Sequence, residues 1–152
     1  MMTAKLDDLD RNILKYLLND SRQSFQDIAN DLDVSGGTIH VRVNKLKEMG
    51  IITGSHISVD YEKLGLGVCV FIGINLSSAK SYNSAVQKLT SLRQITEIYY
   101  TTGQYSMFVK VLLEDTKHLH TFLIEKLQRI EEVQSTETLI VLDQPVHREG
   151  SW

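Results

Sequence analysis

The chain has 152 residues, 42% hydrophobic and 23% charged, which is typical of folded globular proteins rather than of disordered ones. The only cysteine, Cys69, has no disulfide partner, and we interpret it as a small core residue. The longest apolar run, Leu64 to Ile74, is far shorter than the roughly 20 residues of a transmembrane helix. The first residues turn acidic at once, so we expect no signal peptide, no membrane segment and a cytoplasmic protein.

The charge is unevenly distributed. Sixteen Lys and Arg against nineteen Asp and Glu give a net charge of −3, which at first sight disfavours a nucleic-acid partner. The segment from Ser35 to Gly50, however, carries Arg42, Lys45 and Lys47 against Glu48 alone, a net charge of +2. We therefore expect one basic segment that binds DNA weakly in a single copy, so that useful affinity requires several copies acting together.

The first fifty residues predict three short helices. Apolar residues recur at spacings of three and four over residues 8–19, after an acidic start that suits the positive end of a helix dipole. Ser24 opens a second helix with Asp27 three positions on, as in a capping box. Ser35 caps a third helix that ends at Gly50.

The segment after the third helix predicts a β-wing. A turn is followed by alternation of polar and apolar residues over Ile51 to Asp60, which indicates a strand. Three helices and a wing make a winged helix-turn-helix domain over residues 1–60. Residues 61–67, which contain Gly65 and Gly67, are interpreted as a linker.

From residue 68 the pattern changes to a second domain, residues 68–152. Strand-like segments at 68–76, 95–102, 105–113 and 134–142 alternate with helical stripes at 82–89 and 119–130. The order β-α-β-β-α-β predicts a ferredoxin-like domain, so the fold class is α+β.

A sheet of this kind carries helices on one face only. Its other face is predicted to be too apolar to meet water, and we expect it to be a self-association surface. The alternative, that scattered apolar residues are tolerated on an open sheet, stays open. The residues of this face are Phe71, Tyr99, Phe108, Leu112, Leu139 and Val141.

The third helix is expected to enter the major groove, which accommodates one helix. The free backbone amides at its N-terminus can bind a phosphate, and its cationic side chains can contact other phosphates of the DNA backbone. Its short side chains can reach base edges. Arg42 lies at the border of the apolar stripe and could instead brace the domain against an acidic residue. A three-helix core used only for protein contacts is the alternative for the whole unit. The predicted DNA-binding residues are Ser35, Gly36, Gly37, Thr38, His40, Val41, Arg42, Asn44, Lys45 and Lys47.

The sequence resembles the Lrp/AsnC regulators. In the first half, the match includes Leu9-Asp10, Ile28-Ala29, Arg42-Val43 and the run from Gly50 to Gly54. In the second half, it includes the segments Tyr100 to Tyr105 and Ser135 to Leu142, so the resemblance covers roughly residues 6–145. It is closer to the asparagine-responsive AsnC branch than to the leucine-responsive one. Two positions depart from many members: Gly36 replaces a proline and Ser106 an aspartate.

This resemblance implies a transcription regulator that binds double-stranded DNA and a small amino acid, most simply asparagine, with leucine or another amino acid as the alternative. Members form homodimers that often assemble further, commonly as four dimers in a ring, so an octamer is expected. They bind the amino acid at the junction between dimers, and the effect is on oligomeric state or DNA affinity.

For the effector we expect the turn between the second and third strands and the start of the last strand. Gly103 allows backbone amides to approach a carboxylate, and neutral polar side chains suit an amide. Serine at 106 removes a charge that would attract an ammonium group. The alternative, that these are ordinary turn and sheet residues, stays open. The predicted effector residues are Tyr100, Gly103, Gln104, Tyr105, Ser106, Gln134, Ser135, Thr136 and Thr138.

An enzyme, or a regulatory subunit that senses amino acids without binding DNA, is the competing class. His118 and His120 are two positions apart on a helix and do not form a metal pair. No glycine-rich phosphate loop and no nucleophile-elbow serine is present in the sequence. We therefore predict no catalytic residues, no metal and no cofactor other than the amino-acid effector.

Overall fold

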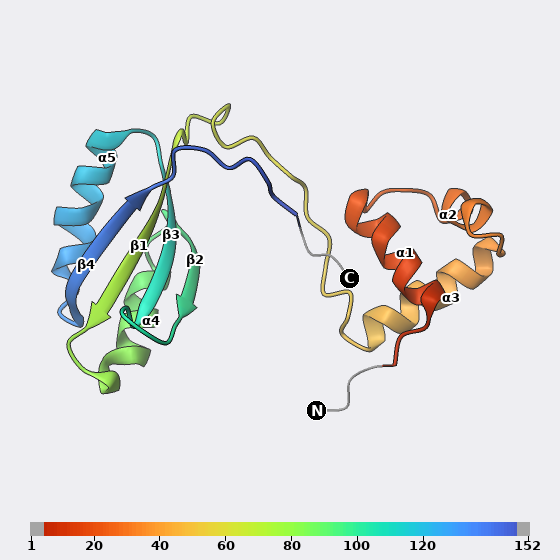
Figure 1. The fold of residues 1–152 in the computed structure, drawn as a ribbon, viewed down its shortest axis with the longest axis horizontal. Coiled ribbons are helices and arrows are strands. Elements are labelled where there is room, and N and C mark those ends of the chain that lie inside the picture. Colours follow the sequence, from red (N-terminus) through yellow and green to blue (C-terminus); the bar gives the residue numbers. More distant parts are fainter. Residues whose placement is uncertain (1–4, 149–152) are drawn as a thin grey trace. The chain divides into compact units, whose positions relative to one another are not determined.

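The computed structural model describes residues 5–148, so the outermost residues of the two predicted domains, 1–4 and 149–152, lie outside the described range. Within that range the chain divides into two compact units, one ending at Ser58 and one spanning Val59 to His147 (Figure 1). Among the described residues, no helix is both long enough and apolar enough to cross a bilayer.

The first unit contains the three predicted helices, α1 (Asp8–Asn19), α2 (Phe25–Asp31) and α3 (Gly36–Glu48). Each begins where a side chain accepts a backbone amide of the first turn, and the capping patterns predicted this for α2 and α3. Ser24 accepts the amide of Asp27, and Ser35 accepts the amide of Thr38. Gly50 follows the end of α3 with a φ of +69°, a conformation that costs glycine little. The local sequence thus determines where these helices start and stop.

The helices pack around a small apolar core. Its members come from all three helices and are at most 2% exposed, and α2 packs against α3. Burying these side chains is what offsets the entropy of ordering helices too short to be stable alone. The buried cluster consists of Ile13, Ile28, Ala29, Ile39 and Val43.

The predicted strand over Ile51 to Asp60 is wrong for this chain. No strand is present between Gly50 and Val68, and Ile57, which should lie on its apolar face, is 81% exposed. Alternation shows which side chains would share a face, but a strand also requires a hydrogen-bonded neighbour. The described part of the chain brings none to this segment. Residues 60–66 instead form a tight turn, in which the amide of Leu66 donates to the carbonyl of Tyr61.

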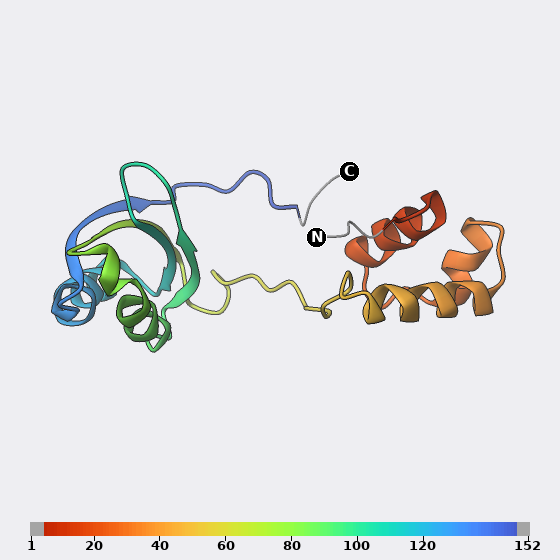
Figure 2. The ribbon, with the colours of Figure 1, turned by 90° about the horizontal axis from the view of Figure 1, so that it is seen from below.

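The second unit is the predicted βαββαβ domain. In chain order it contains β1 (Val68–Leu76), α4 (Tyr82–Thr90), β2 (Ile95–Tyr100), β3 (Met107–Leu113), α5 (Thr116–Thr121) and β4 (Val133–Ile140). The strands form one antiparallel sheet in the order β2-β3-β1-β4. Figure 2 shows that α4 and the helix that begins with α5 cover the same face of this sheet.

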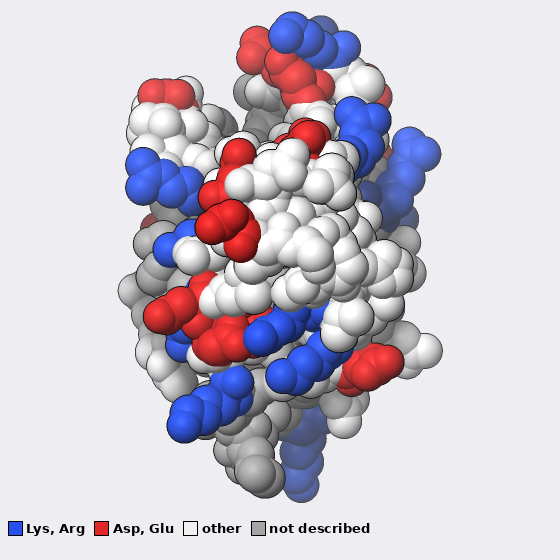
Figure 3. All heavy atoms as spheres, turned by 90° about the vertical axis from the view of Figure 1, so that its right-hand side faces the viewer, with Lys and Arg blue, Asp and Glu red and all other residues white. Residues whose placement is uncertain are grey.

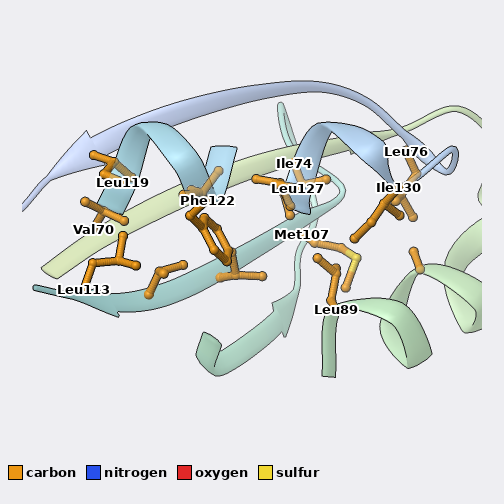
Figure 4. Packing of buried hydrophobic residues seen from close by; sticks show 14 residues of the cluster. Val70, Ile74, Leu76, Leu89, Met107, Leu113, Leu119, Phe122, Leu127 and Ile130 are labelled. Atoms are coloured by element: carbon orange, nitrogen blue, oxygen red, sulfur yellow. The ribbon is translucent and has the colours of Figure 1, made fainter. Parts of the chain in front are cut away.

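The predicted helix over 119–130 changes its hydrogen-bond pattern along its length. After α5 it continues as one π-helical stretch, Phe122–Lys126, and then as a 3₁₀ turn, Leu127–Arg129. The change in pitch keeps Leu119, Phe122 and Leu127 at the sheet, where each is at most 6% exposed. Figure 4 shows these side chains over Val70 and Ile74 of β1 and Met107 of β3.

The strand register assigns side chains to the two faces. Directly opposed residues of antiparallel strands share a face. Val70, Ile72 and Ile74 are fully buried beneath the helices, so their neighbours in β1 lie on the open face. Cys69 is one of these and is paired with Leu112, half-buried on the open face rather than in the core as predicted. Burial raises the pKa of its thiol.

Candidate DNA-binding and effector sites

The outer surface of α3 carries most of the predicted DNA-binding side chains. His40, Val41, Asn44, Lys45 and Lys47 are exposed, and Val41 is 67% exposed although it is apolar. Figure 3 views this unit from the side of α2 and the beginning of α3, where a broad uncharged area is bordered by both acidic and basic side chains. Base edges can meet the uncharged area, whereas phosphates can meet only the basic parts of its border, because carboxylates repel them.

The beginning of α3 is organised by its own cap. Ser35 accepts the amide of Thr38, and the hydroxyls of the two residues lie 2.8 Å apart. A Cβ at position 36 would lie 2.8 Å from Oε1 of Gln26, so a larger residue here would require the end of the Gln26 side chain to move. The Gln26 side chain is held in turn by Asn30, 3.1 Å away. The amides at the N-terminus of α3 remain at the positive end of the helix dipole, where a phosphate is stabilised.

Arg42 faces the body of the unit. Its guanidinium donates to Asp7 and to Oδ1 of Asp10, the latter at 3.1 Å, and the Asp10 side chain is only 2% exposed. The hydrogen bonds from these two carboxylates raise the pKa of Arg42. The guanidinium therefore holds α1 against α3, which is the bracing alternative, and we withdraw the assignment of Arg42 to phosphate. Lys45 and Lys47 remain as the exposed cations of the helix.

The first unit also has an apolar groove of about 900 Å³. It lies beside α1 and the end of α3, with Leu14, Leu17, Val43 and Ile52 among its lining residues. None of the predicted effector residues lines it, because all of them belong to the second unit.

The predicted effector residues gather at one end of the sheet but do not form one pocket within a subunit. Tyr100, Met107, Ile74 and Thr136 occupy one row across the four strands. Three strand spacings place Tyr100 and Thr136 about 14 Å apart, which exceeds the length of a free amino acid. The backbone turn at Gly103, with a φ of +103°, extends beyond the row.

Two of the predicted effector residues, Tyr100 and Tyr105, lie on opposite faces of the sheet. Tyr100 shares the helix-covered face with α4, where its ring packs edge-on against Tyr82 with centroids 4.7 Å apart. Tyr105 lies on the open face against Phe108, with centroids 5.1 Å apart. Thr136 and Thr138, paired with Ile74 and Ile72, belong to the helix-covered face, whereas Ser135 belongs to the open one. Gln134 is exposed and lies at the register shift of β4, between the paired residues Val133 and Ser135.

Ser106 anchors the hairpin between β2 and β3 to β1. Its amide donates to the carbonyl of Ile74, and its hydroxyl accepts the amide of Leu76 at 3.4 Å. Thr101 closes the same hairpin, because its hydroxyl donates to the carbonyl of Tyr105 at 2.8 Å. In this chain the serine thus fixes the turn that carries exposed Gln104.

Sequence reasoning missed Gly73. A Cβ at this position would lie 2.7 Å from the ring of Tyr105, so only glycine lets the tyrosine lie flat on the strand. The available signal was a glycine in the middle of an otherwise apolar strand, which often marks close approach of another group.

A polar cluster beside Gly73 was also missed. Asn75 donates to the hydroxyl of Ser135 across the β1–β4 pair at 3.2 Å. Glu137 is paired with Gly73 and therefore shares the open face with them. This cluster places a carboxylate, an amide and a hydroxyl on the same face of the sheet as the Tyr105 ring. The oxygens of these groups can accept hydrogen bonds from the ammonium group of an amino acid. The neutral Ser106 offers that ammonium group no opposite charge.

The remainder of the open face is largely apolar, as predicted. The register places Phe71, Phe108, Leu112, Leu139 and Val141 on it, together with Tyr99. One ion pair interrupts this surface: Lys110 lies 3.1 Å from Glu97. A hydrogen bond from Tyr99 and the charge of Lys110 lower the pKa of Glu97. Leu139 and Tyr99 are each 49% exposed, so the described residues leave part of this face open to solvent.

Comparison with known proteins gives matches to both units. Residues 6–53 match the family model described as winged helix-turn-helix DNA-binding, and residues 69–150 match the Lrp/AsnC ligand binding domain. Regulatory protein AsnC of Escherichia coli is 52% identical over 143 residues, which cover 94% of each chain. Regulatory protein AsnC of Haemophilus influenzae is 47% identical over 144 residues, covering 95% of this chain and 96% of that protein.

Solved structures agree with these matches. The structure of E. coli AsnC superimposes with a TM-score of 0.90 at 51% identity, covering 95% of this chain and 97% of that one. The transcriptional regulator NMB0573 of Neisseria meningitidis, solved as a complex with L-Met, gives a TM-score of 0.91 and covers 95% of each chain. At 18% identity the second comparison speaks for the fold alone.

Proposed function

The chain belongs to the Lrp/AsnC family of transcription regulators, and we propose that the amino acid to which it responds is asparagine. Its two family matches and its AsnC relatives identify it as a ligand-responsive, DNA-binding transcription regulator rather than an enzyme. The choice of asparagine is supported by the neutral hydrogen-bonding groups at the β2–β3 turn and the start of β4. It is also supported by relatives that carry the name AsnC at 52% and 47% identity.

The separation of the predicted effector residues supports a proposal about where the amino acid binds. They lie at one end of the sheet, but on two faces and about 14 Å apart at the extremes. One amino acid cannot contact all of them within one subunit, so a site built from some of them needs further groups, which a second copy can bring alongside. We therefore place the effector at a seam between copies, with the Gly103 turn and Ser135 as the contributing segments.

The open sheet face supports a homodimer as the basic unit. It is too apolar to remain in water, and a second copy of the same face is its simplest partner. A dimer presents two α3 helices to half-sites one helical turn apart. We expect the dimers to assemble further, into an octamer. Several DNA-binding units in one particle would compensate for the weak DNA affinity expected of a single chain with a net charge of −3.

The test uses the full-length protein and a duplex selected with it from a randomised library. Asparagine, methionine and leucine are titrated separately while DNA affinity and particle mass are measured. We expect asparagine to change affinity by about 5- to 150-fold, the range of ordinary allosteric coupling, and the other two to act weakly. A larger response to methionine or leucine would overturn asparagine but keep the regulator. No response to any of the twenty amino acids, in affinity or in mass, would overturn the sensing proposal.

A further inference from the structure

We propose that Phe25, His40 and Asn44 form a reading unit, in which His40 Nε2 donates a hydrogen bond to an acceptor on a base edge. Phe25 and Asn44 are positioning residues that orient the imidazole. This inference rests on the proposed role of α3 at the DNA and goes beyond it by naming the chemistry of one recognised base.

The imidazole is held from two sides. The ring of Phe25, the first residue of α2, meets the ring of His40 edge-on, with centroids 5.9 Å apart and planes at 80°. Asn44 lies one helical turn beyond His40, and its Nδ2 is 3.1 Å from Nδ1 of the imidazole. An exposed histidine would otherwise sample several rotamers. These two contacts reduce that freedom before DNA arrives, which lowers the entropic cost of binding.

We infer the tautomer of His40 from its contact with Asn44, whose Nδ2 faces Nδ1 of the imidazole. An amide Nδ2 can only donate, so Nδ1 of His40 accepts. In a neutral imidazole the single proton is then on Nε2, the nitrogen that Asn44 does not engage. The unit therefore presents a donor rather than an acceptor.

A single donor discriminates between bases in the major groove. Guanine offers the acceptors N7 and O6, adenine offers N7, and thymine offers O4, whereas cytosine offers only its N4 donor. His40 should therefore disfavour cytosine at the base it faces and favour guanine, whose two adjacent acceptors give Nε2 more than one satisfactory geometry. The neighbouring Ser35 and Thr38 hydroxyls are bonded to each other, so they compete less for the same edge.

The experiment is selection of duplexes from a randomised library by the full-length protein and four variants, followed by sequencing. His40→Ala removes the reader. Asn44→Ala removes the hydrogen bond to Nδ1 of His40. Asn44 is exposed on α3, so this change should leave the fold intact. Phe25→Leu removes the ring contact but keeps an apolar side chain. Tyr16→Leu is the matched control, because Tyr16 packs on the same core cluster from α1.

We expect one position in each half-site to select against cytosine by about 3- to 10-fold, the worth of one hydrogen bond. His40→Ala should abolish that preference, and Asn44→Ala and Phe25→Leu should weaken it at the same position, while Tyr16→Leu leaves it intact. The inference is overturned if His40→Ala retains the wild-type preference, or if the other two variants weaken binding to all sequences equally. If the wild-type protein selects no sequence at all, the proposed DNA-binding role fails, and the inference fails with it.

Discussion

The guanidinium of Arg42 lies 3.1 Å from the buried carboxylate of Asp10, which ties the recognition helix α3 to α1. Asp10 also accepts the amide of Asp7, at 3.3 Å, and Asp7 in turn accepts the amide of Asp10 and caps α1. One arginine thus holds the first turn of α1 and neutralises a carboxylate that is 2% exposed. The guanidinium of Arg42 is therefore paired within the domain and is not available to a DNA phosphate.

Replacing Arg42 with Met should therefore affect folding more than DNA affinity. The buried Asp10 would lose its cation, and the thermal unfolding midpoint should fall. The slope of log affinity against log salt should stay unchanged for Arg42→Met. Its magnitude should decrease by about 0.9 for Lys45→Met because, of these two residues, only Lys45 is free to contact a phosphate and displace a counterion. Calorimetry and binding isotherms at several salt concentrations measure the two effects. A slope reduced in Arg42→Met as much as in Lys45→Met would return Arg42 to the phosphate contacts.

The approach of Tyr105 to Gly73 predicts a coupled pair of mutations. Gly73→Ala puts a Cβ within 2.7 Å of the ring and should destabilise the second unit by about 1–3 kcal/mol. In a Tyr105→Ala background the same change should cost little, because the clash is gone. Urea unfolding of the four proteins of this double-mutant cycle gives the coupling energy. Additive costs would show that the ring moves aside freely.

Self-association is tested at Leu139, which is 49% exposed on the open sheet face. Leu139→Lys should leave the monomer folded but weaken the dimer by about a hundredfold or more, since an unpaired charge would be buried in an apolar contact. Ile124, which is 46% exposed in the π-helical stretch that follows α5, supplies the control Ile124→Lys. Analytical ultracentrifugation distinguishes the two. Equal masses for both variants would place the interface elsewhere.

Glu132 predicts acid sensitivity of the second unit. Hydrogen bonds from Lys88, 2.8 Å away, and from Ser84 lower the pKa of Glu132 from 4.5 to about 2. A carboxyl with a depressed pKa in the folded state stabilises fully above its unfolded value, and this contribution is lost as the pH falls from about 4.5 towards 2. Glu132→Gln should thus reduce stability at pH 7 and flatten its decline over that range. Denaturation at several pH values measures this, with the exposed neighbour Glu131→Gln as the control. Parallel pH profiles for wild type and Glu132→Gln would contradict it.

Several elements were predictable because their causes are local. Asp7, Ser24, Ser35 and Gly50 mark the helix ends of the first unit through bonds to residues a few positions away. The alternation in β1 likewise predicted one buried and one open face, because side-chain direction in a strand follows from the backbone alone. The basic character of α3 and the polar residues near Gly103 were visible for the same reason.

Other features depended on residues distant in sequence. Asp10 and Arg42 are 32 positions apart, and only the packing of α1 on α3 decided that the arginine is a brace. The strand register, not composition, placed Tyr100 and Tyr105 on opposite faces and brought Asn75 to Ser135. The segment 51–60 had the pattern of a strand, but residues 5–148 bring no hydrogen-bonded neighbour to it. Local sequence thus determined elements and exposed chemistry, whereas pairing between distant segments decided which groups were free, because hydrogen bonds and ion pairs require both partners in place.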